Sequence, residues 1–247
     1  MDKWRAFAED SLTTHAPETR QMKPQLAHKS VLITSANRYM GPAIADLFAQ
    51  EGASVTQDNG TTYYQEEVDS LLTSTPDILI LNLAEPPRSA PVDDITDHDW
   101  NTLFEALVHP MMRIIRSVVG PMKTRGSGKI IAVTSAAPLR GIPHASAYCA
   151  ARGAQNAFIR ATGLELAKFN IQVNAIAQNY IRNDTYYPDG MLENAKFDQH
   201  LKQMVPTKRV AESRETAQLA LYLASEHCSH MVGQVLPLAG GWATTTG

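Results

Sequence analysis

Short apolar runs alternate with longer segments of helical periodicity along most of the chain. The apolar runs are Val31–Thr34, Ala53–Thr56, Asp77–Leu83, Lys129–Thr134, Ile171–Ala177 and Gln234–Pro237. Segments with apolar residues at helical spacing lie between them, at Gly41–Gln50, Trp100–Lys123, Ser146–Lys168 and Glu215–Ala224. Runs as uniformly apolar as Asp77–Leu83 are typical of strands that are buried on both faces.

This alternation predicts an α/β fold built on a doubly wound, Rossmann-like parallel sheet in a single domain, residues 29–247. Residues 1–28 are expected to form an N-terminal arm, because Thr13–Pro24 carries two prolines and few apolar residues, with a short helix at Met1–Ser11. Ligands of such sheets bind beyond the carboxyl ends of the strands, so we look for chemistry there.

Composition narrows the classes of partner. The 247 residues carry a net charge of -3, so there is no basic excess to bind nucleic acid. No apolar run is long enough to span a membrane or to act as a signal peptide, which predicts a cytoplasmic protein. The two cysteines form no disulfide framework, and the eight histidines lack metal-ligand spacing, so we expect no metal.

The first strand–turn–helix, Thr34–Gly41, is where a dinucleotide-binding protein needs glycines so that backbone can approach phosphate. Only Gly41 is present, and Tyr39 is bulky. We therefore expect no nicotinamide cofactor. Tyr39 then forms either the wall of a small pocket or part of the core. Asp58 follows the second predicted strand, where NAD enzymes hold a ribose, and without the glycine turn it is expected to be a solvated loop charge.

Ser135, Tyr148 and Arg152 form the candidate catalytic group. Ser135 ends a buried strand, and Tyr148 and Arg152 are spaced i, i+4 in a helical segment, which places both on one face. A free phenol has a pKa of roughly 10, and a cation within about 4–6 Å lowers it. Arg152 is thus expected to activate Tyr148 as a base, with Ser135 holding the substrate oxygen. An ordinary Tyr–Arg surface stack is the structural alternative.

From about Lys29 to Ala243 the chain resembles the short-chain dehydrogenase/reductase superfamily. The resemblance rests on Thr34…Gly41, Asp77–Asn82, Ser135…Tyr148…Arg152, Val173-Asn174, Leu223-Ala224-Ser225, Gly233 and Gly240-Gly241. The departures are specific. The family's oxidoreductases carry Lys where this chain has Arg152, Gly near Tyr39, Asn at the position of Leu107, and Pro-Gly at Gln178-Asn179.

This set of departures resembles the halohydrin dehalogenases, carbon–halide lyases of the same superfamily. The resemblance implies displacement of halide from a vicinal halohydrin to give an epoxide without a cofactor, and epoxide opening by small anions such as azide, cyanide and nitrite. It also implies catalysis by Ser135, Tyr148 and Arg152, and a homotetramer packed through the helices Trp100–Lys123 and Ser146–Lys168. The implied halide and substrate pocket comprises Tyr39, Gln178, Asn179, Tyr180, Ile181, Tyr186 and Tyr187, with backbone N–H groups of the loop binding the halide.

Two other interpretations stay open. An NAD(P)-dependent short-chain reductase with an atypical site would bind NADH or NADPH. A non-catalytic binding module of the same fold would show neither that binding nor acid release from halohydrins. Trp242, near the carboxyl terminus, either packs within its own subunit or reaches a neighbour's site.

Overall fold

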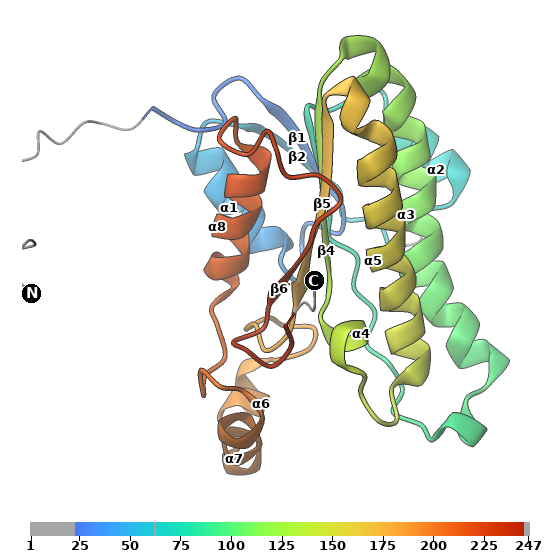
Figure 1. The fold of residues 1–247 in the computed structure, drawn as a ribbon, viewed down its shortest axis with the longest axis vertical. Helices are drawn as coiled ribbons and strands as arrows, with labels where there is room; N and C mark the ends of the chain where they lie inside the picture. Colours follow the sequence, from blue (N-terminus) through green and yellow to red (C-terminus); the bar gives the residue numbers. More distant parts are fainter. Residues whose placement is uncertain (1–22, 62, 245–247) are drawn as a thin grey trace, which may run out of the picture.

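The computed structural model describes residues 23–61 and 63–244, and its centre is a six-stranded parallel sheet with helices on both faces (Figure 1). The strand order is β2-β1-β3-β4-β5-β6. The strands are β1 Ser30–Ile33, β2 Ser54–Gln57, β3 Ile78–Leu81, β4 Gly128–Ser135, β5 Ile171–Gln178 and β6 Val235–Leu238. This arrangement confirms the predicted doubly wound, Rossmann-like fold.

Helices α1 and α8 cover one face of the sheet, and α2, α3 and α5 cover the other (Figure 1). The short α4 and the pair α6–α7 lie beyond the end of the sheet where β4 finishes. The helices are α1 Gly41–Gln50, α2 Gln65–Leu71, α3 Asp97–Arg125, α4 Ala137–Arg140, α5 Ser146–Leu166, α6 Asp189–Leu192, α7 Ala195–Met204 and α8 Ser213–Ala224, with 3-10 turns η1 Val92–Asp94 and η2 Ala167–Phe169.

The sheet separates two hydrophobic cores, and the central strands contribute side chains to both. In β3, Ile78 and Ile80 point into the core under α1 and α8, whereas Leu79 and Leu81 point into the core under α3 and α5. Successive side chains of a strand leave opposite faces, so a strand between two helical layers must be apolar at every position. This requirement explains the uninterrupted apolar sequence of β3.

The predicted helix Gly41–Gln50 matches α1, while the predicted Trp100–Lys123 begins too late. Helix α3 starts at Asp97 because Thr96 and Asp99 form a capping box, in which the Thr96 side chain accepts from the Asp99 N–H. It ends at Gly126, whose positive φ of 70° closes the last turn. Helices α2, α4, α6 and α7 were not predicted from the sequence.

The start of the domain lies before Lys29. Residues 1–22, including the helix expected at Met1–Ser11, are outside the described residues. Leu26 is fully buried in the core under α1, and its N–H donates to the Glu51 carbonyl. The end of the expected arm is therefore part of the packed structure.

Helix α5 packs closely on the sheet near the start of β5, at the end opposite the strand termini Ser135 and Gln178. Its Gly163 lies so near the backbone of Gly233 and Val173 that a Cβ would overlap the Gly233 nitrogen.

In the described parts of the chain, no helix is both long enough and apolar enough to cross a bilayer.

Gly163→Ala is expected to destabilise the protein by about 1–3 kcal/mol, because the added methyl forces backbone apart. Gly120→Ala, at an exposed helical position with open space around it, is the matched control and should stabilise by about 0.5–1 kcal/mol. Urea unfolding measures both, and equal free energies of unfolding for Gly163→Ala and wild type would contradict the close contact.

Candidate active site

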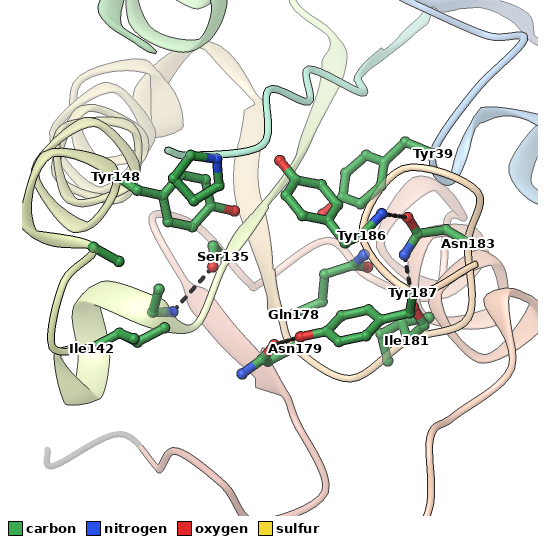
Figure 2. A pocket seen from close by; sticks show the side chains of 13 residues that line it. Tyr39, Ser135, Ile142, Tyr148, Gln178, Asn179, Ile181, Asn183, Tyr186 and Tyr187 are labelled. Carbon is green, nitrogen blue, oxygen red and sulfur yellow. Dashed lines mark hydrogen bonds between the residues drawn. The ribbon is translucent and has the colours of Figure 1, made fainter. Parts of the chain in front are cut away.

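A cavity of about 200 Å³ lies at the carboxyl ends of β4 and β5 (Figure 2). Its lining comprises Tyr39, Pro87, Ser135, Ala137, Ile142, Ala145, Tyr148, Gln178, Asn179, Ile181, Asn183, Tyr186 and Tyr187. The structure therefore brings Ser135 and Tyr148 together with every predicted pocket residue except Tyr180.

Ser135 is the last residue of β4 and lies opposite Gln178 of β5. Its Oγ accepts a hydrogen bond of 3.1 Å from the Ala137 N–H. The Asn156 side chain donates to the Ser135 carbonyl at 3.2 Å, which fixes the backbone there. Because the hydroxyl oxygen is already held as an acceptor, its hydrogen is available to a ligand oxygen in the cavity.

Tyr148 and Arg152 lie one turn apart on α5. The Arg152 Nε donates a hydrogen bond of 3.1 Å to the Tyr148 Oη, and its guanidinium carbon is 5.3 Å from the phenol ring centre. Tyr148 lines the cavity, whereas Arg152 has no exposed surface at all. The cation is therefore placed behind the phenol, away from solvent, and is not part of a surface stack.

Every acceptor of the Arg152 guanidinium is uncharged. Nη1 donates to the Leu83 carbonyl at 3.1 Å and to the Gln155 Oε1 at 2.9 Å, and Nη2 donates to the Tyr186 Oη at 3.0 Å. None of the described carboxylates forms an ion pair with it. A buried cation without a counter-charge is costly, so this site favours an anion close to Arg152.

The other two phenols near Arg152 are held neutral. Burial raises the pKa of Tyr39 and Tyr186 above the usual phenol range, and the Arg152 charge only partly opposes it. Burial acts to lower the pKa of Arg152, but the negative charge that the neighbouring phenols, Tyr148 first, carry once ionised outweighs it, so this pKa is raised. The Tyr186 Oη accepts from the Glu85 N–H at 3.1 Å and donates to the Glu85 carbonyl at 3.0 Å, and its ring meets Tyr39 edge-on at 5.3 Å.

The loop after β5 offers fewer free N–H groups than the sequence analysis expected. The Asn179 N–H donates to the Leu238 carbonyl, and the Tyr180 N–H to the Asn179 side chain. Within the described chain, the Ile181 N–H has no acceptor. The Tyr187 Oη donates to the Asn179 Oδ1 at 2.5 Å and closes this side of the cavity. Any anion bound by this backbone therefore meets the Ile181 N–H.

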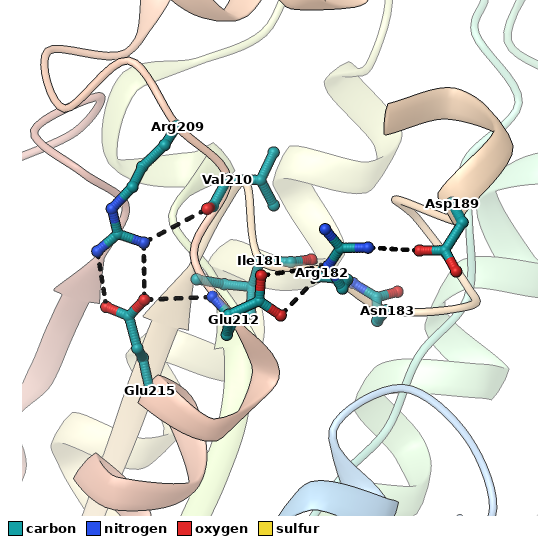
Figure 3. Close-up of polar contacts among 8 residues, drawn as sticks. All are labelled: Ile181, Arg182, Asn183, Asp189, Arg209, Val210, Glu212 and Glu215. Atoms are coloured by element: carbon teal, nitrogen blue, oxygen red, sulfur yellow. Dashed lines mark hydrogen bonds and ion pairs between the residues drawn. The ribbon is translucent and has the colours of Figure 1, made fainter. Parts of the chain in front are cut away.

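The outside of this loop is held by ion pairs (Figure 3). Arg182 contacts Asp189 at 2.6 Å and Glu212 at 3.2 Å, and Arg209 contacts Glu215 at 2.7 Å. All five side chains are substantially exposed, so each pair contributes only about 0–1 kcal/mol. Their effect is to connect the loop to the start of α8.

Tyr180 lies outside the cavity lining. Its ring packs between Tyr187 at 5.5 Å and Trp242 at 6.1 Å, and its Oη is 3.2 Å from the Nε2 of His200 on α7. Tyr180 has a positive φ of 53°, which turns its side chain away from the loop's inner face. Trp242 is buried within its own chain.

Gln155 and five of the lining residues were not predicted from the sequence: Pro87, Ala137, Ile142, Ala145 and Asn183. Gln155 is fully buried and joins Arg152 to α3 through the Leu107 carbonyl; its position three residues after Arg152, on the same helix face, is a signal that was available. Asn183 accepts from the N–H groups of Thr185 and Tyr186 and so shapes the turn that carries Tyr186. An Asn opening a turn is a common signal, too general to identify a site.

The turn between β1 and α1 does not fit a dinucleotide phosphate. Six of its N–H groups donate to the protein's own oxygens. The N–H groups of Ser35, Tyr39 and Met40 donate to the side chains of Tyr63, Asp184 and Asn82. The N–H groups of Ala36, Arg38 and Gly41 donate to the backbone carbonyls of Asp58, Ser35 and Arg38. The Asp184 carboxylate, at 3.1 Å from the Tyr39 nitrogen, stands at the start of α1 where a phosphate would bind.

Asp58 is not the solvated charge that the sequence suggested. Its carboxylate accepts a hydrogen bond of 2.5 Å from the Tyr63 Oη and one of 3.1 Å from the Gly60 N–H. The Asp58 carboxylate is therefore already hydrogen-bonded within the chain. Among the described residues there is no cluster of three His, Cys, Asp or Glu side chains suited to a metal ion.

Comparison with known sequences finds reductases. The family described as enoyl-(acyl carrier protein) reductase matches residues 55–243. A 3-oxoacyl-(acyl-carrier-protein) reductase FabG from Chlamydia muridarum is 29% identical, over 90% of this chain and 100% of its own length.

Comparison with solved structures finds dehalogenases, and also dehydrogenases and a reductase that share the fold with TM-scores of 0.80–0.81 at 21–24% identity. A protein named "Dehalogenation enzyme" superimposes with a TM-score of 0.83 at 28% identity, covering 89% of this chain and 100% of its own. A halohydrin dehalogenase, HheC, bound to ethyl (2S)-oxiran-2-ylacetate superimposes with a TM-score of 0.79 at 26% identity, covering 88% of this chain and 98% of its own.

Proposed function

This chain belongs to the enoyl-(acyl carrier protein) reductase family of the short-chain dehydrogenase/reductase superfamily, and within it we propose that the protein is a halohydrin dehalogenase that needs no cofactor. The observation that carries the proposal is the buried guanidinium of Arg152, which meets only neutral acceptors in the described chain and donates to the phenol facing the cavity. The similarity to solved dehalogenases supports it.

Tyr148 acts as the general base. A fixed cation beside a phenol favours the phenolate over the neutral form, and Arg152 cannot lose its own proton in the working pH range. Tyr39 and Tyr186, whose pKa values are raised by burial, remain neutral. Of the three phenols around Arg152, we assign the role of base to Tyr148, which receives the Arg152 Nε hydrogen bond and lines the cavity.

The reaction is an internal displacement. Ser135 donates a hydrogen bond to the hydroxyl oxygen of a vicinal halohydrin, and Tyr148 takes the proton from that oxygen. The alkoxide attacks the neighbouring carbon, so a carbon–oxygen bond forms while the carbon–halogen bond breaks and the halide leaves with its electron pair. The products are an epoxide and a halide ion, and no hydride moves. The reverse reaction opens an epoxide with a small anion.

The leaving halide binds on the other side of the cavity. The free N–H of Ile181 offers it a hydrogen bond, and the rings of Tyr39 and Tyr187 offer their positive edges. Gln178 and Asn179 complete this wall, while Tyr180 supports it from behind through Tyr187. The resemblance implied that several backbone N–H groups of this loop bind the halide. In this assignment one backbone N–H group, that of Ile181, does so.

Cavity size indicates short substrates. About 200 Å³ is below the roughly 300–1,000 Å³ typical of sites for drug-sized ligands. The substrate end is walled by Pro87, Ile142 and Ala145, which offer apolar contact without further hydrogen bonds. We therefore assign short aliphatic halohydrins as the preferred class.

An NAD(P)-dependent reductase is the second candidate, because the similar sequences are reductases. The two functions separate in one pair of measurements. Halide and proton release from a short chlorohydrin without added nucleotide supports the dehalogenase, whereas micromolar binding of NADH or NADPH in a fluorescence titration supports the reductase.

Tyr148→Phe is expected to lower kcat/KM for halide release by roughly 10²–10⁴-fold, the range of a lost general base. The fold should persist, because the change removes only an oxygen. Tyr222→Phe, at an exposed site on α8, is the matched control and should match wild type. Halide release and thermal unfolding are measured together, and near-native activity of Tyr148→Phe would show that another group is the base.

Arg152→Lys is expected to lower the rate and to move the pH-dependent rise in activity to higher pH. A lysine cannot reproduce the guanidinium's separate contacts to Tyr148, Leu83 and Tyr186. Burial also favours a neutral amine, so the cation weakens as the pH rises. A pH–rate profile with the wild-type midpoint would argue that Arg152 does not control Tyr148.

The proposed assembly is a homotetramer packed through α3 and α5. Their outer surfaces carry apolar side chains, including Trp100, which is 41% exposed and stacks on Phe104, and Leu164, which is 72% exposed. Light scattering during size-exclusion chromatography should give about four times the 27.1 kDa chain mass. A monomer mass would contradict this arrangement.

A further inference from the structure

Gln155 lies at the centre of the polar contacts around Arg152, although it does not touch the cavity. It is fully buried on α5, one turn after Arg152. Its Oε1 accepts from the Arg152 Nη1 at 2.9 Å, and its Nε2 donates to the Leu107 carbonyl of α3 at 2.7 Å.

The bond to Leu107 determines which end of the amide faces Arg152. A backbone carbonyl can only accept, so the NH₂ end of Gln155 must point to α3 and the oxygen must point to the guanidinium. With Nη1 held by Gln155 and Leu83, the rotation of the guanidinium about its own axis is set. Its Nε is then directed at the Tyr148 Oη.

The neutrality of Gln155 matters as much as its geometry. It is the one side-chain amide among the acceptors of Arg152, and a carboxylate of the same shape would accept the same hydrogen bond. A carboxylate there would also compensate the buried charge. The Arg152 charge stabilises a nearby anion only while no carboxylate compensates that charge. Because Gln155 is a neutral amide, the full charge can act on the Tyr148 phenol.

We propose that Gln155 is a positioning residue of this site: it orients the guanidinium of Arg152 toward Tyr148 and, because it is uncharged, leaves the positive charge free to act on the phenol. This inference deepens the proposed function and rests on it where halide release is the readout. It excludes a purely structural role, in which any side chain that fills the same space would serve.

Two variants separate orientation from charge. Gln155→Glu keeps an acceptor toward Arg152, loses the hydrogen bond to Leu107 and adds a negative charge, so the midpoint of the pH–rate profile should move up by about one unit or more. Gln155→Met keeps volume and neutrality but loses both hydrogen bonds. It should lower kcat by about 10–100-fold, with KM and the pH midpoint close to wild type.

A second readout does not depend on the reaction. The ultraviolet absorbance of phenolate is titrated in wild type, in Gln155→Glu and in Gln155→Met, each with and without Tyr148→Phe. The absorbance change that disappears with Tyr148→Phe belongs to Tyr148. It should appear at higher pH in Gln155→Glu than in wild type or in Gln155→Met.

The outcomes are distinct. A wild-type protein that releases no halide contradicts the proposed function, while the phenolate titration still tests Gln155. Gln155→Glu with wild-type midpoints in both readouts overturns the charge argument. If Gln155→Glu does not fold, Gln155→Met decides alone: wild-type kcat overturns the orienting role, and a lowered kcat at unchanged KM supports it.

Discussion

The structure of the site follows from one costly feature, a buried guanidinium whose acceptors in the described chain are all neutral. Arg152 is surrounded by two carbonyl-type oxygens and two phenols. Solvation by such dipoles lets the cation remain inside the protein without cancelling its charge. The positions of Tyr186 and Gln155 are explained by this need, since each supplies an oxygen at one edge of the guanidinium. The phenols of Tyr148 and Tyr186 also line the cavity, and the Tyr186 Oη is in addition hydrogen-bonded to the Glu85 backbone.

The fold was predictable because its signals are local. The apolar run of β3 and the glycine that follows α1 identify their elements directly. The i, i+4 spacing of Tyr148 and Arg152 predicts that the two proposed catalytic groups meet, without any knowledge of tertiary structure. The start of α3 was missed because Thr96 caps the helix ahead of its first apolar residue. The hydrogen bond from Arg152 to Leu83 could not be predicted, because its acceptor is a backbone carbonyl and every residue type has one.

Likeness to reductases and likeness to dehalogenases both extend over most of the chain, because proteins of both kinds share this fold. The site therefore distinguishes the two functions better than the fold does. At the turn before α1, Asp184 and Tyr63 satisfy N–H groups that a phosphate would otherwise need. The cofactor groove is closed by side chains while the framework around it is retained.

Chemistry and pocket shape reside on separate stretches of this chain. Ser135, Tyr148 and Arg152 belong to β4 and α5, which are anchored in the sheet and its core. The opposite wall belongs to the loop after β5, and α7 contacts it through aromatic rings around Tyr180. Insertions or exchanges in residues 189–204 can therefore remodel the wall while leaving the reacting groups in place. Because the two groups of residues lie on separate segments, the range of accepted substrates can change during evolution while Ser135, Tyr148 and Arg152 keep their positions.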